Sequence, residues 1–391
     1  MVCMSRLRTS ASAPVTVQSE IRAMSVLCEQ AGGINMSQGI CDTDVPTVVM
    51  DGAKAAMDAG LNIYTRLDGI ARLRTAIAAD WSWRSGMAID PDREVIVTSG
   101  ATGAFYCAAR GLMNPGDEVI LFEPMYGYHA YTLRGLGLKP VIVPLEYGSW
   151  ALDVDVLRAA ITPKTRAIVL NTPSNPCGKV FTRDELQAVA DVAIEQDLFV
   201  LSDEIYEHFI YPGHTHIPMA TLPGMKERTI TLSGFSKTYS VTGWRVGYLI
   251  ADAKWIPTIG FFSDTVYICA PAPFQHGCAA GLELLPPSFY KELAAEHDRK
   301  RKQTVAALSD AGLTPYMPDG AYYIVADATR LRGATAAEKA RDLLAQTGVA
   351  AVAGSAFFRK GGGENLLRFC FGKRDADLDE ACERLRGLAR S

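Results

Sequence analysis

S-G-F-S-K-T-Y-S-V-T-G-W-R-V-G-Y, residues 233–248, is the stretch of sequence that decides the fold. Lys237 follows a predicted strand among small residues, and Arg245 comes eight positions later. A lysine that forms an imine needs free space around its nitrogen, and it benefits from a lowered pKa. A guanidinium offers a planar fork that suits a phosphate dianion. A single lysine is normally a solvated surface residue, but the small, apolar neighbours weaken that interpretation for Lys237.

Short β-branched runs alternate with helical stretches on both sides of this block. The predicted strands are 94–98, 118–122, 140–143, 167–170, 198–201, 229–232 and 247–250. Helices are predicted at 102–112 and 182–196, and Thr182 with Glu185 has the pattern of a capping box. This alternation predicts an α/β fold with a mainly parallel seven-stranded sheet between helices.

The pattern changes near residue 287, where a long charged helix at 289–311 leads into shorter elements. Strands are predicted there at 321–325, 349–352 and 365–371. A chain of 391 residues is long enough for two cores. We therefore expect a large domain at 44–288 and a smaller α+β domain made of 1–43 and 289–391.

Composition excludes several classes of protein. The net charge of −4 gives no sign of a nucleic-acid surface, and the apolar runs are too short to span a bilayer. The nine cysteines are scattered, without C-x-x-C or zinc spacing, so we expect reduced thiols in the cytoplasm and no metal site. Residues 1–19 contain no acid and several Ser and Arg, which suits either a short targeting segment or, as we favour, a frayed start.

A second motif, F-V-L-S-D-E-I-Y at 199–206, places Asp203 at the C-terminal end of an apolar strand. Ligands of open α/β sheets bind at that end. A buried carboxylate there needs a cationic partner, and a protonated pyridine nitrogen would be one. The alternative is an aspartate that caps the following helix.

Two further segments follow predicted strands. L-N-T-P-S-N-P-C-G at 170–178 is rich in turn formers, so Asn175 could donate to a phenolate oxygen while Pro176 fixes the turn. V-T-S-G-A-T-G at 97–103 places small residues at a helix start, where backbone N–H groups bind phosphate well. Each segment is a weak signal by itself.

Taken in order, N-x-P-x-N-P-x-G, S-D-E-x-Y and the lysine block resemble the class I/II aminotransferases of fold-type I, which use pyridoxal 5'-phosphate. The resemblance runs from about Ile21 to Leu385. Within that family, residues 35–46 and 100–105 look most similar to the kynurenine/glutamine/cysteine-conjugate branch.

The resemblance implies a catalytic set of Lys237, Asp203 and Tyr206. Lys237 would hold the cofactor as an imine and serve as general base, and Asp203 would keep the pyridine nitrogen protonated. The further cofactor contacts that it implies are Asn175 and Tyr206 at the phenolic oxygen, Tyr126 on the ring face, and Gly100, Ala101, Thr102, Ser236 and Arg245 around the phosphate. Tyr128 lies close enough in sequence to compete for the role of Tyr126.

Three residues are implied to contact the substrate: Gly39, Asn175 and Arg368. Arg368 would grip the α-carboxylate, and its apolar strand makes a purely structural arginine costly. Tyr64 resembles the tyrosine that reaches the phosphate of the neighbouring subunit, which implies a homodimer with shared sites, although it could also be a simple surface residue.

The sequence departs from the family pattern at three positions. Gly234 stands where many relatives have a phosphate-contacting serine, so Ser236 or water must supply more of that shell. Cys177 replaces a commoner threonine, without expected effect on catalysis. Thr102 replaces a lysine found in some aspartate-specific relatives, which argues mildly against aspartate as the donor.

The expected activity is transfer of the α-amino group of an L-amino acid to a 2-oxo acid by a ping-pong mechanism. One alternative is a β-lyase with the same cofactor that acts on cysteine-type conjugates. A less favoured alternative is a non-catalytic protein that binds pyridoxal phosphate. The sequence leaves the amino acid and the oxo acid open.

Overall fold

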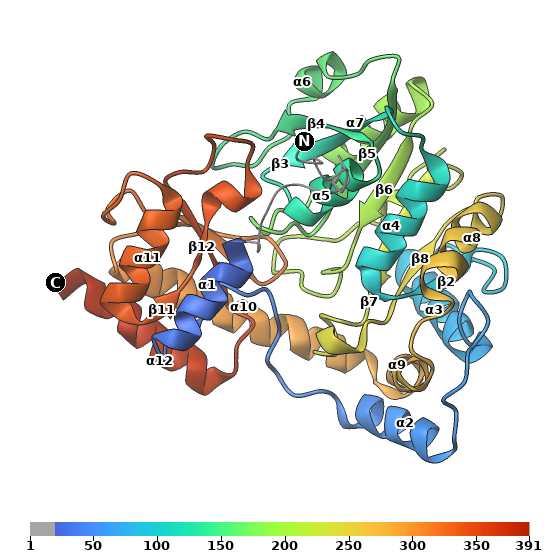
Figure 1. Ribbon diagram of the computed structural model, residues 1–391, viewed down its shortest axis with the longest axis horizontal. Coiled ribbons are helices and arrows are strands. Elements are labelled where there is room, and N and C mark those ends of the chain that lie inside the picture. Colours follow the sequence, from blue (N-terminus) through green and yellow to red (C-terminus); the bar gives the residue numbers. More distant parts are fainter. Residues whose placement is uncertain (1–19, 391) are drawn as a thin grey trace, which may run out of the picture.

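The computed structural model describes residues 20–390, so the expectation for residues 1–19 lies outside the described part of the chain. Figure 1 shows a large α/β body built around a sheet, with a second group of helices and short strands beside it.

The seven-stranded sheet has the order β2-β8-β7-β6-β5-β3-β4. Its strands are β2 (Val95–Thr98), β3 (Glu118–Glu123), β4 (Lys139–Pro144), β5 (Thr165–Asn171), β6 (Phe199–Asp203), β7 (Thr229–Gly234) and β8 (Gly247–Ile250). β8 runs antiparallel to both neighbours, and the other pairs are parallel. The predicted α/β fold with a mainly parallel sheet of seven strands is confirmed.

Helices cover both faces of this sheet because successive strand residues point to opposite sides. Ile168 and Val200 pack against α7 (Arg183–Glu195), whereas Val169 and Leu201 pack into the core formed with α4 (Gly100–Leu112). The remaining helices of this body are α2 (Thr47–Asp58), α3 (Ala71–Ser85), α5 (Gly127–Gly135), α6 (Val154–Ala159), α8 (Ile256–Tyr267) and α9 (Ala272–Leu284), with short 3-10 turns η1 (Met219–Thr221) and η2 (Thr242–Trp244).

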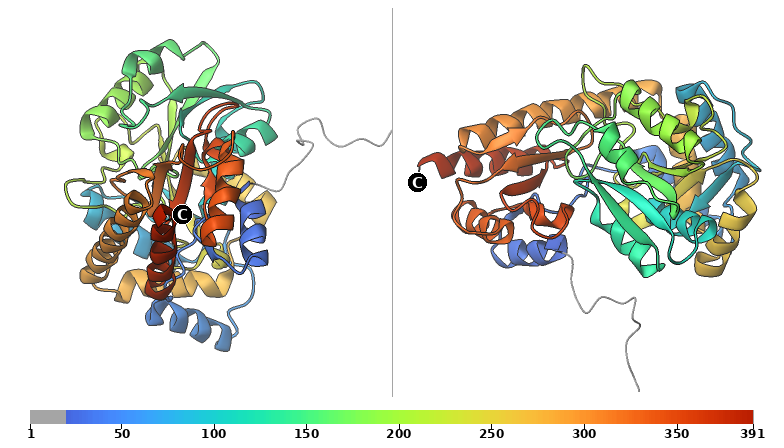
Figure 2. Two further views of the ribbon diagram at one scale, coloured as in Figure 1. Left: turned by 90° about the vertical axis from the view of Figure 1, so that its left-hand side faces the viewer. Right: turned by 90° about the horizontal axis from the view of Figure 1, so that it is seen from above.

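The C-terminal third forms a second group around the long helix α10 (Pro287–Asp310), coloured orange in Figure 2. A four-stranded antiparallel sheet has the order β12-β13-β10-β9. Its elements are β9 (Thr314–Tyr316), β10 (Tyr323–Asp327), α11 (Ala336–Thr347), β12 (Val352–Ala353), η3 (Gly354–Phe357), β13 (Leu366–Cys370), α12 (Asp375–Gly387) and η4 (Leu388–Arg390).

The N-terminal segment packs on this second group. α1 (Glu20–Gln30) contacts β11 (Val349–Ala350) and β12, and β1 (Ile34–Asn35) pairs in parallel with β11. The division into 44–288 and 1–43 with 289–391 stays a prediction. α10 begins at Pro287 and so crosses the second boundary.

Two predicted strands differ in detail from the structure. The segment 349–352 is not one strand, because β11 joins β1 while β12 joins β13 in another sheet. The strand predicted at 321–325 begins only at Tyr323, since Ala321 has a φ of 57° and cannot continue an extended backbone.

The structure bears on the expectations about membrane spans and about cysteines. No helix within residues 20–390 is long and apolar enough to cross a membrane. The eight cysteines of the described part are free thiols.

The predicted capping box at the start of α7 is present. The Thr182 hydroxyl accepts from the Glu185 backbone N–H at 3.2 Å, and the Glu185 carboxylate accepts from the Thr182 N–H at 2.9 Å. Replacing Thr182→Ala removes one of these bonds, so we expect the free energy of unfolding to fall by about 1 kcal/mol. Chemical denaturation measures this change. Thr182→Ser is the matched control and should unfold like the parent, while an unchanged T182A midpoint would contradict the role of the cap.

Candidate active site

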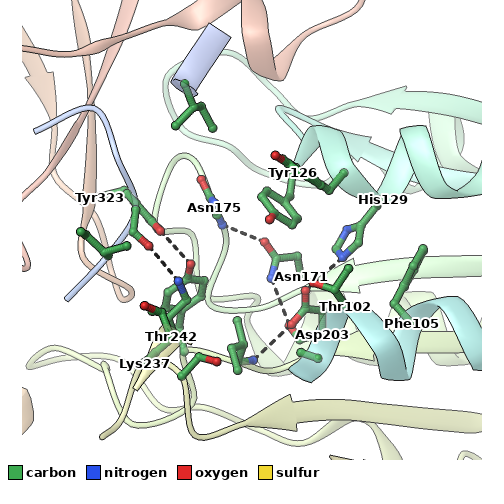
Figure 3. A pocket seen from close by; sticks show the side chains of 18 of the residues that line it. Thr102, Phe105, Tyr126, His129, Asn171, Asn175, Asp203, Lys237, Thr242 and Tyr323 are labelled. Atoms are coloured by element: carbon green, nitrogen blue, oxygen red, sulfur yellow. Dashed lines mark hydrogen bonds and ion pairs between the residues drawn. The ribbon is translucent and has the colours of Figure 1, made fainter. Parts of the chain in front are cut away.

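A cavity of about 560 Å³ opens at the carboxyl ends of the parallel strands. Side chains from β5, β6 and the segment after β7 face it, together with residues of α4, α5 and the N-terminal segment (Figure 3). The structure brings most of the predicted site residues to its walls: Gly39, Ala101, Thr102, Tyr126, Asn175, Asp203, Tyr206, Ser236, Lys237, Arg245 and Arg368. Gly100 and Tyr64 do not line it.

Lys237 lies where β7 has ended, and its side chain crosses toward the N-terminal segment. Its Nζ donates to the Gly39 carbonyl oxygen at 2.8 Å and lies 5.8 Å from the centre of the Tyr206 ring. Burial removes water from the ammonium group and lowers the pKa of Lys237 to about 8, although the nearby Cys370 and Cys41 thiols oppose the shift. A substantial fraction of neutral amine is therefore present near neutral pH, as nucleophilic and general-base chemistry requires.

Asp203 ends β6, and it is 7% exposed. Its Oδ2 lies 3.0 Å from Nε2 of His129, and its Oδ1 accepts from the Ile205 backbone N–H at 3.3 Å. The His129 ring packs against Phe105, with ring centroids 4.5 Å apart. The His129 imidazole thus fixes the orientation of the Asp203 carboxylate, which borders the cavity.

Asn175 and Arg368 are joined across the two parts of the molecule. The Arg368 guanidinium donates to Asn175 Oδ1 at 2.9 Å and to the Ser37 carbonyl oxygen, and it lies over the Tyr323 ring at 4.4 Å. Arg368 is 1% exposed, and its Nε has no hydrogen-bond partner among the described residues. The side chain is therefore fixed in place but keeps donor capacity at a wall of the cavity.

Two tyrosines close the side of the cavity near Lys237. The hydroxyls of Tyr206 and Tyr323 lie 2.8 Å apart. Burial raises the pKa of both hydroxyls, so both remain protonated and able to donate. A Cβ on Gly39 would lie 2.2 Å from the Tyr323 hydroxyl oxygen, which explains the need for glycine at this position.

Another part of the cavity wall has the features of an anion site. α4 begins at Gly100, and Ala101, Thr102 and Ser236 border the cavity beside it. The Arg245 guanidinium lies against Gly100, because a Cβ there would meet its Nη2 at 2.5 Å. A Cβ on Gly247 would meet the Ala101 nitrogen at 2.5 Å, so glycine keeps the helix start open. Backbone N–H groups of a helix start and a guanidinium together suit a phosphate dianion.

Tyr64 lies apart from this pocket, in the segment between α2 and α3. Its side chain is 76% exposed, and that of its neighbour Ile63 is 80% exposed. Within one chain it is a surface residue.

The sequence reasoning missed several residues that border the cavity. The most informative are His129, Asn171, Phe105 and Tyr323. Asn171 donates to the Asp203 carbonyl oxygen at 3.2 Å and accepts from the Asn175 backbone N–H at 2.8 Å.

The sequence did contain a signal for His129, since this residue follows Tyr126 by three positions at the start of a helix and so shares its face. The role of Tyr323 depends on long-range packing and left no local signal.

The mainly parallel sheet and the polar pocket at its strand ends have the layout expected of a pyridoxal-phosphate-dependent transferase of fold-type I. The family model for aminotransferase class I and II matches residues 31–385, and the chain belongs to this family. The expected fold, family and cofactor are thereby confirmed.

Several aminotransferases are similar to this chain over most of their length. A probable N-succinyldiaminopimelate aminotransferase, DapC, of Mycobacterium tuberculosis is 37% identical over 98% of both chains. Kynurenine–oxoglutarate transaminase 3 of Mus musculus is 36% identical over 90% of this chain and 83% of its own, which supports the expected likeness to the kynurenine branch. The solved N-succinyldiaminopimelate aminotransferase from M. tuberculosis superimposes with a TM-score of 0.94 at 36% identity, covering 98% of this chain and 100% of its own.

The residues of the pocket fit this cofactor. A desolvated lysine, a buried carboxylate and a glycine-lined helix start with an arginine match its aldehyde, ring nitrogen and phosphate in chemical type.

The lowered pKa of Lys237 predicts how the cofactor-free protein takes up pyridoxal phosphate. Only the neutral amine attacks an aldehyde, so the uptake rate should rise with pH and level off above about 8. Stopped-flow absorbance measures this rate. Nα-acetyl-lysine is the matched control, and its rate should keep rising to about pH 10. A protein profile that follows the free lysine would show that the pocket does not alter the amine.

Proposed function

We propose that this aminotransferase moves the α-amino group of an L-amino acid to a 2-oxo acid by a ping-pong mechanism in which Lys237 holds the cofactor covalently. The observation that carries the proposal is the position of Lys237 Nζ. This amine is desolvated, donates to the Gly39 carbonyl oxygen at 2.8 Å, and lies in the same cavity as Asp203 and Arg368.

Bound pyridoxal phosphate supplies the electron sink that stabilises negative charge at the substrate's α-carbon. Asp203 is the residue proposed to keep the ring nitrogen protonated, and its contact with His129 holds it in that orientation. Tyr126 is proposed to cover the ring face. Its ring stacks on Tyr128 with centroids 5.3 Å apart, so Tyr128 is placed to support Tyr126 rather than replace it.

The phenolic oxygen and the phosphate are assigned to opposite walls of the pocket. Asn175 offers its Nδ2 to the phenolic oxygen, since its Oδ1 already accepts from Arg368. Tyr206 is proposed to donate its hydroxyl to the same oxygen. The phosphate is assigned to Gly100, Ala101, Thr102, Ser236 and Arg245, with Gly234 contributing no side chain.

The substrate's α-carboxylate is assigned to Arg368. Charge pairing is strong there because the guanidinium is buried, and its planar fork matches a carboxylate. Asn175 and Gly39 lie beside it and would complete the contacts with the substrate.

Proton transfer is assigned to Lys237 Nζ once the substrate has taken its place on the cofactor. The neutral amine would remove the proton from the substrate's α-carbon and would carry it at Nζ for return to the cofactor. The buried surroundings that lower its pKa to about 8 favour the neutral form needed for the first of these transfers.

A homodimer with shared sites is the assembly that we propose. The exposed Tyr64 and Ile63 form a protruding apolar segment, which has the character of an interface rather than of a solvated loop. Tyr64 would then reach the phosphate held by the other subunit. Cytoplasmic location also stays a proposal, supported by the free thiols.

Substitution of the two central residues tests the mechanism. Lys237→Ala should abolish turnover, and Asp203→Ala should lower kcat by several orders of magnitude, because the ring nitrogen loses its counter-charge. Both are measured with amino acid and oxo acid in coupled assays. Asp203→Glu is the matched control and should retain more activity than D203A. Near-normal turnover of D203A would remove the ring-nitrogen role, and pyruvate with ammonia formed without an acceptor would indicate β-lyase chemistry instead.

Mixing two defective variants tests the shared site. A dimer of Lys237→Ala with Tyr64→Ala contains one site with both residues intact, so an equal mixture should recover activity at roughly a quarter of the sites. Each variant alone, unfolded and refolded in the same way, is the control. The assay is transamination after joint refolding. No recovery, with hybrid dimers present by mass spectrometry, would contradict the role of Tyr64 across the interface.

A further inference from the structure

A buried cysteine and histidine form a close pair behind Lys237. Cys41 Sγ lies 3.7 Å from Nε2 of His297 and 3.1 Å from the Thr43 hydroxyl. Cys41 is 5% exposed, and His297 is fully buried. The pair joins the N-terminal segment to α10, and nothing in the proposed transamination uses it.

The protonation of His297 follows from its other contact. Its Nδ1 lies 2.8 Å from the Leu293 carbonyl oxygen, which can only accept a hydrogen bond. Nδ1 therefore carries a proton, and in the neutral ring Nε2 presents its lone pair to the Cys41 thiol. Cys41 and His297 thus have the arrangement of a thiol and its base.

The surroundings of Cys41 favour its thiolate. Burial by itself would raise the pKa of the thiol, but the hydrogen bond and charge of His297, with the Thr43 and Ser240 hydroxyls, lower it to about 7. Two other thiols behave differently: burial alone raises the pKa of Cys107 to about 12, and burial raises that of Cys382 to about 11 although Arg386 and a hydrogen bond with Thr304 oppose the shift.

Other titratable groups also face this thiol. The positive charge of Lys237 favours a Cys41 thiolate. The Cys370 thiol and the hydroxyls of Tyr211 and Tyr322 are the other titratable groups near this pair. Those three groups are neutral near pH 7, because burial raises the pKa of each. They therefore add no negative charge that would oppose the thiolate.

A second cavity lies beside the two hydroxyl partners of the thiol. It has a volume of about 370 Å³ and lies between the N-terminal segment, the residues after Lys237, and α10. Thr43 and Ser240 line it, and their hydroxyls lie 2.7 Å apart. The Thr43 hydroxyl, which lines this cavity, lies 3.1 Å from Cys41 Sγ.

We propose that Cys41 is a site of reversible oxidation by small hydroperoxides, with His297 as its base. His297 Nε2 takes the thiol proton. The sulfur attacks one peroxide oxygen, an S–O bond forms, and the O–O bond breaks. The departing oxygen, hydroxide from hydrogen peroxide or alkoxide from an organic hydroperoxide, takes the proton from His297 and leaves as water or an alcohol, so the thiol is oxidised to a sulfenic acid while the peroxide is reduced.

Oxidation at Cys41 acts on the active site through two intervening residues. The Gly39 carbonyl accepts from Lys237 Nζ at 2.8 Å, and the Ile40 carbonyl lies 3.6 Å from Cys370 Sγ. We expect an oxygen added to the buried Cys41 sulfur to displace the backbone that positions Lys237, and so to lower activity until a thiol reductant removes it.

The test treats the cofactor-loaded enzyme with hydrogen peroxide in the presence of dimedone, which labels sulfenic acids. Peptide mass spectrometry locates and times the label. We expect labelling at Cys41, and a rate roughly tenfold lower in His297→Gln because the thiolate fraction at pH 7 falls. Equal labelling of C41 in the parent and in H297Q would overturn the role of His297. Label at other cysteines alone would overturn the site.

Matched variants connect the label to activity. Cys41→Ser should keep most of the parent activity and lose sensitivity to peroxide, whereas Cys278→Ser, which removes a buried thiol without such partners, should stay as sensitive as the parent. Dithiothreitol should restore the oxidised parent. Peroxide inactivation that is unchanged in C41S would overturn the link to the active site.

One more variant avoids the buried histidine, in case H297Q does not fold. Thr43→Val removes a hydroxyl partner of the thiol at the edge of the second cavity while keeping the side-chain volume. We expect a slower reaction of Cys41 with iodoacetamide, and a midpoint of its pH profile above that of the parent. An unchanged profile would overturn the proposed thiolate stabilisation.

Discussion

Parallel pairing of β5, β6 and β7 is the constraint on which the site depends. Asn171 pairs with Asp203 across β5 and β6, and Asp203 pairs with Leu232 across β6 and β7. All three strands therefore end at the same edge, with Lys237 a few residues past the last of them. A slip of one residue would turn Asp203 to the opposite face of the sheet, so the register is as necessary to the site as the side chains themselves.

The side chains at the end of β6 and just after it point alternately into two different surroundings. Asp203 and Tyr206 border the cavity, while Glu204 and Glu207 point into a buried polar cluster behind it. Glu207 accepts from Ser233, Tyr248 and Arg84, and Arg84 offsets the cost of burial so that the pKa of Glu207 falls to about 2. Loss of the Arg84–Glu207 pair would strongly destabilise the fold, because removing the guanidinium would leave a buried, unpaired carboxylate. The cluster holds the turn that carries Tyr206.

The sequence predicted what is local or repeated, and it missed what depends on distant contacts. The seven strands, the capping box at Thr182 and the chemistry of the lysine block all follow from short-range patterns. The break between β11 and β12 does not, because two sheets compete for neighbouring residues there. His129 and Tyr323 reach the cavity only through tertiary packing. The side chain of Tyr64 is exposed in the single chain, and no local sequence pattern predicts that exposure.

The position of Arg368 on β13 has a consequence for how such an enzyme diversifies. The arginine belongs to the four-stranded sheet, whereas Asp203 ends a strand of the large sheet and Lys237 follows another of its strands. Apart from Asn175, which accepts a hydrogen bond from Arg368, the residues proposed for the cofactor and the arginine proposed for the substrate are thus carried by separate cores. Drift in the C-terminal third and the N-terminal segment can reshape substrate choice without disturbing the chemical step. A family built in this way can keep one catalytic apparatus while its members come to serve different metabolic needs.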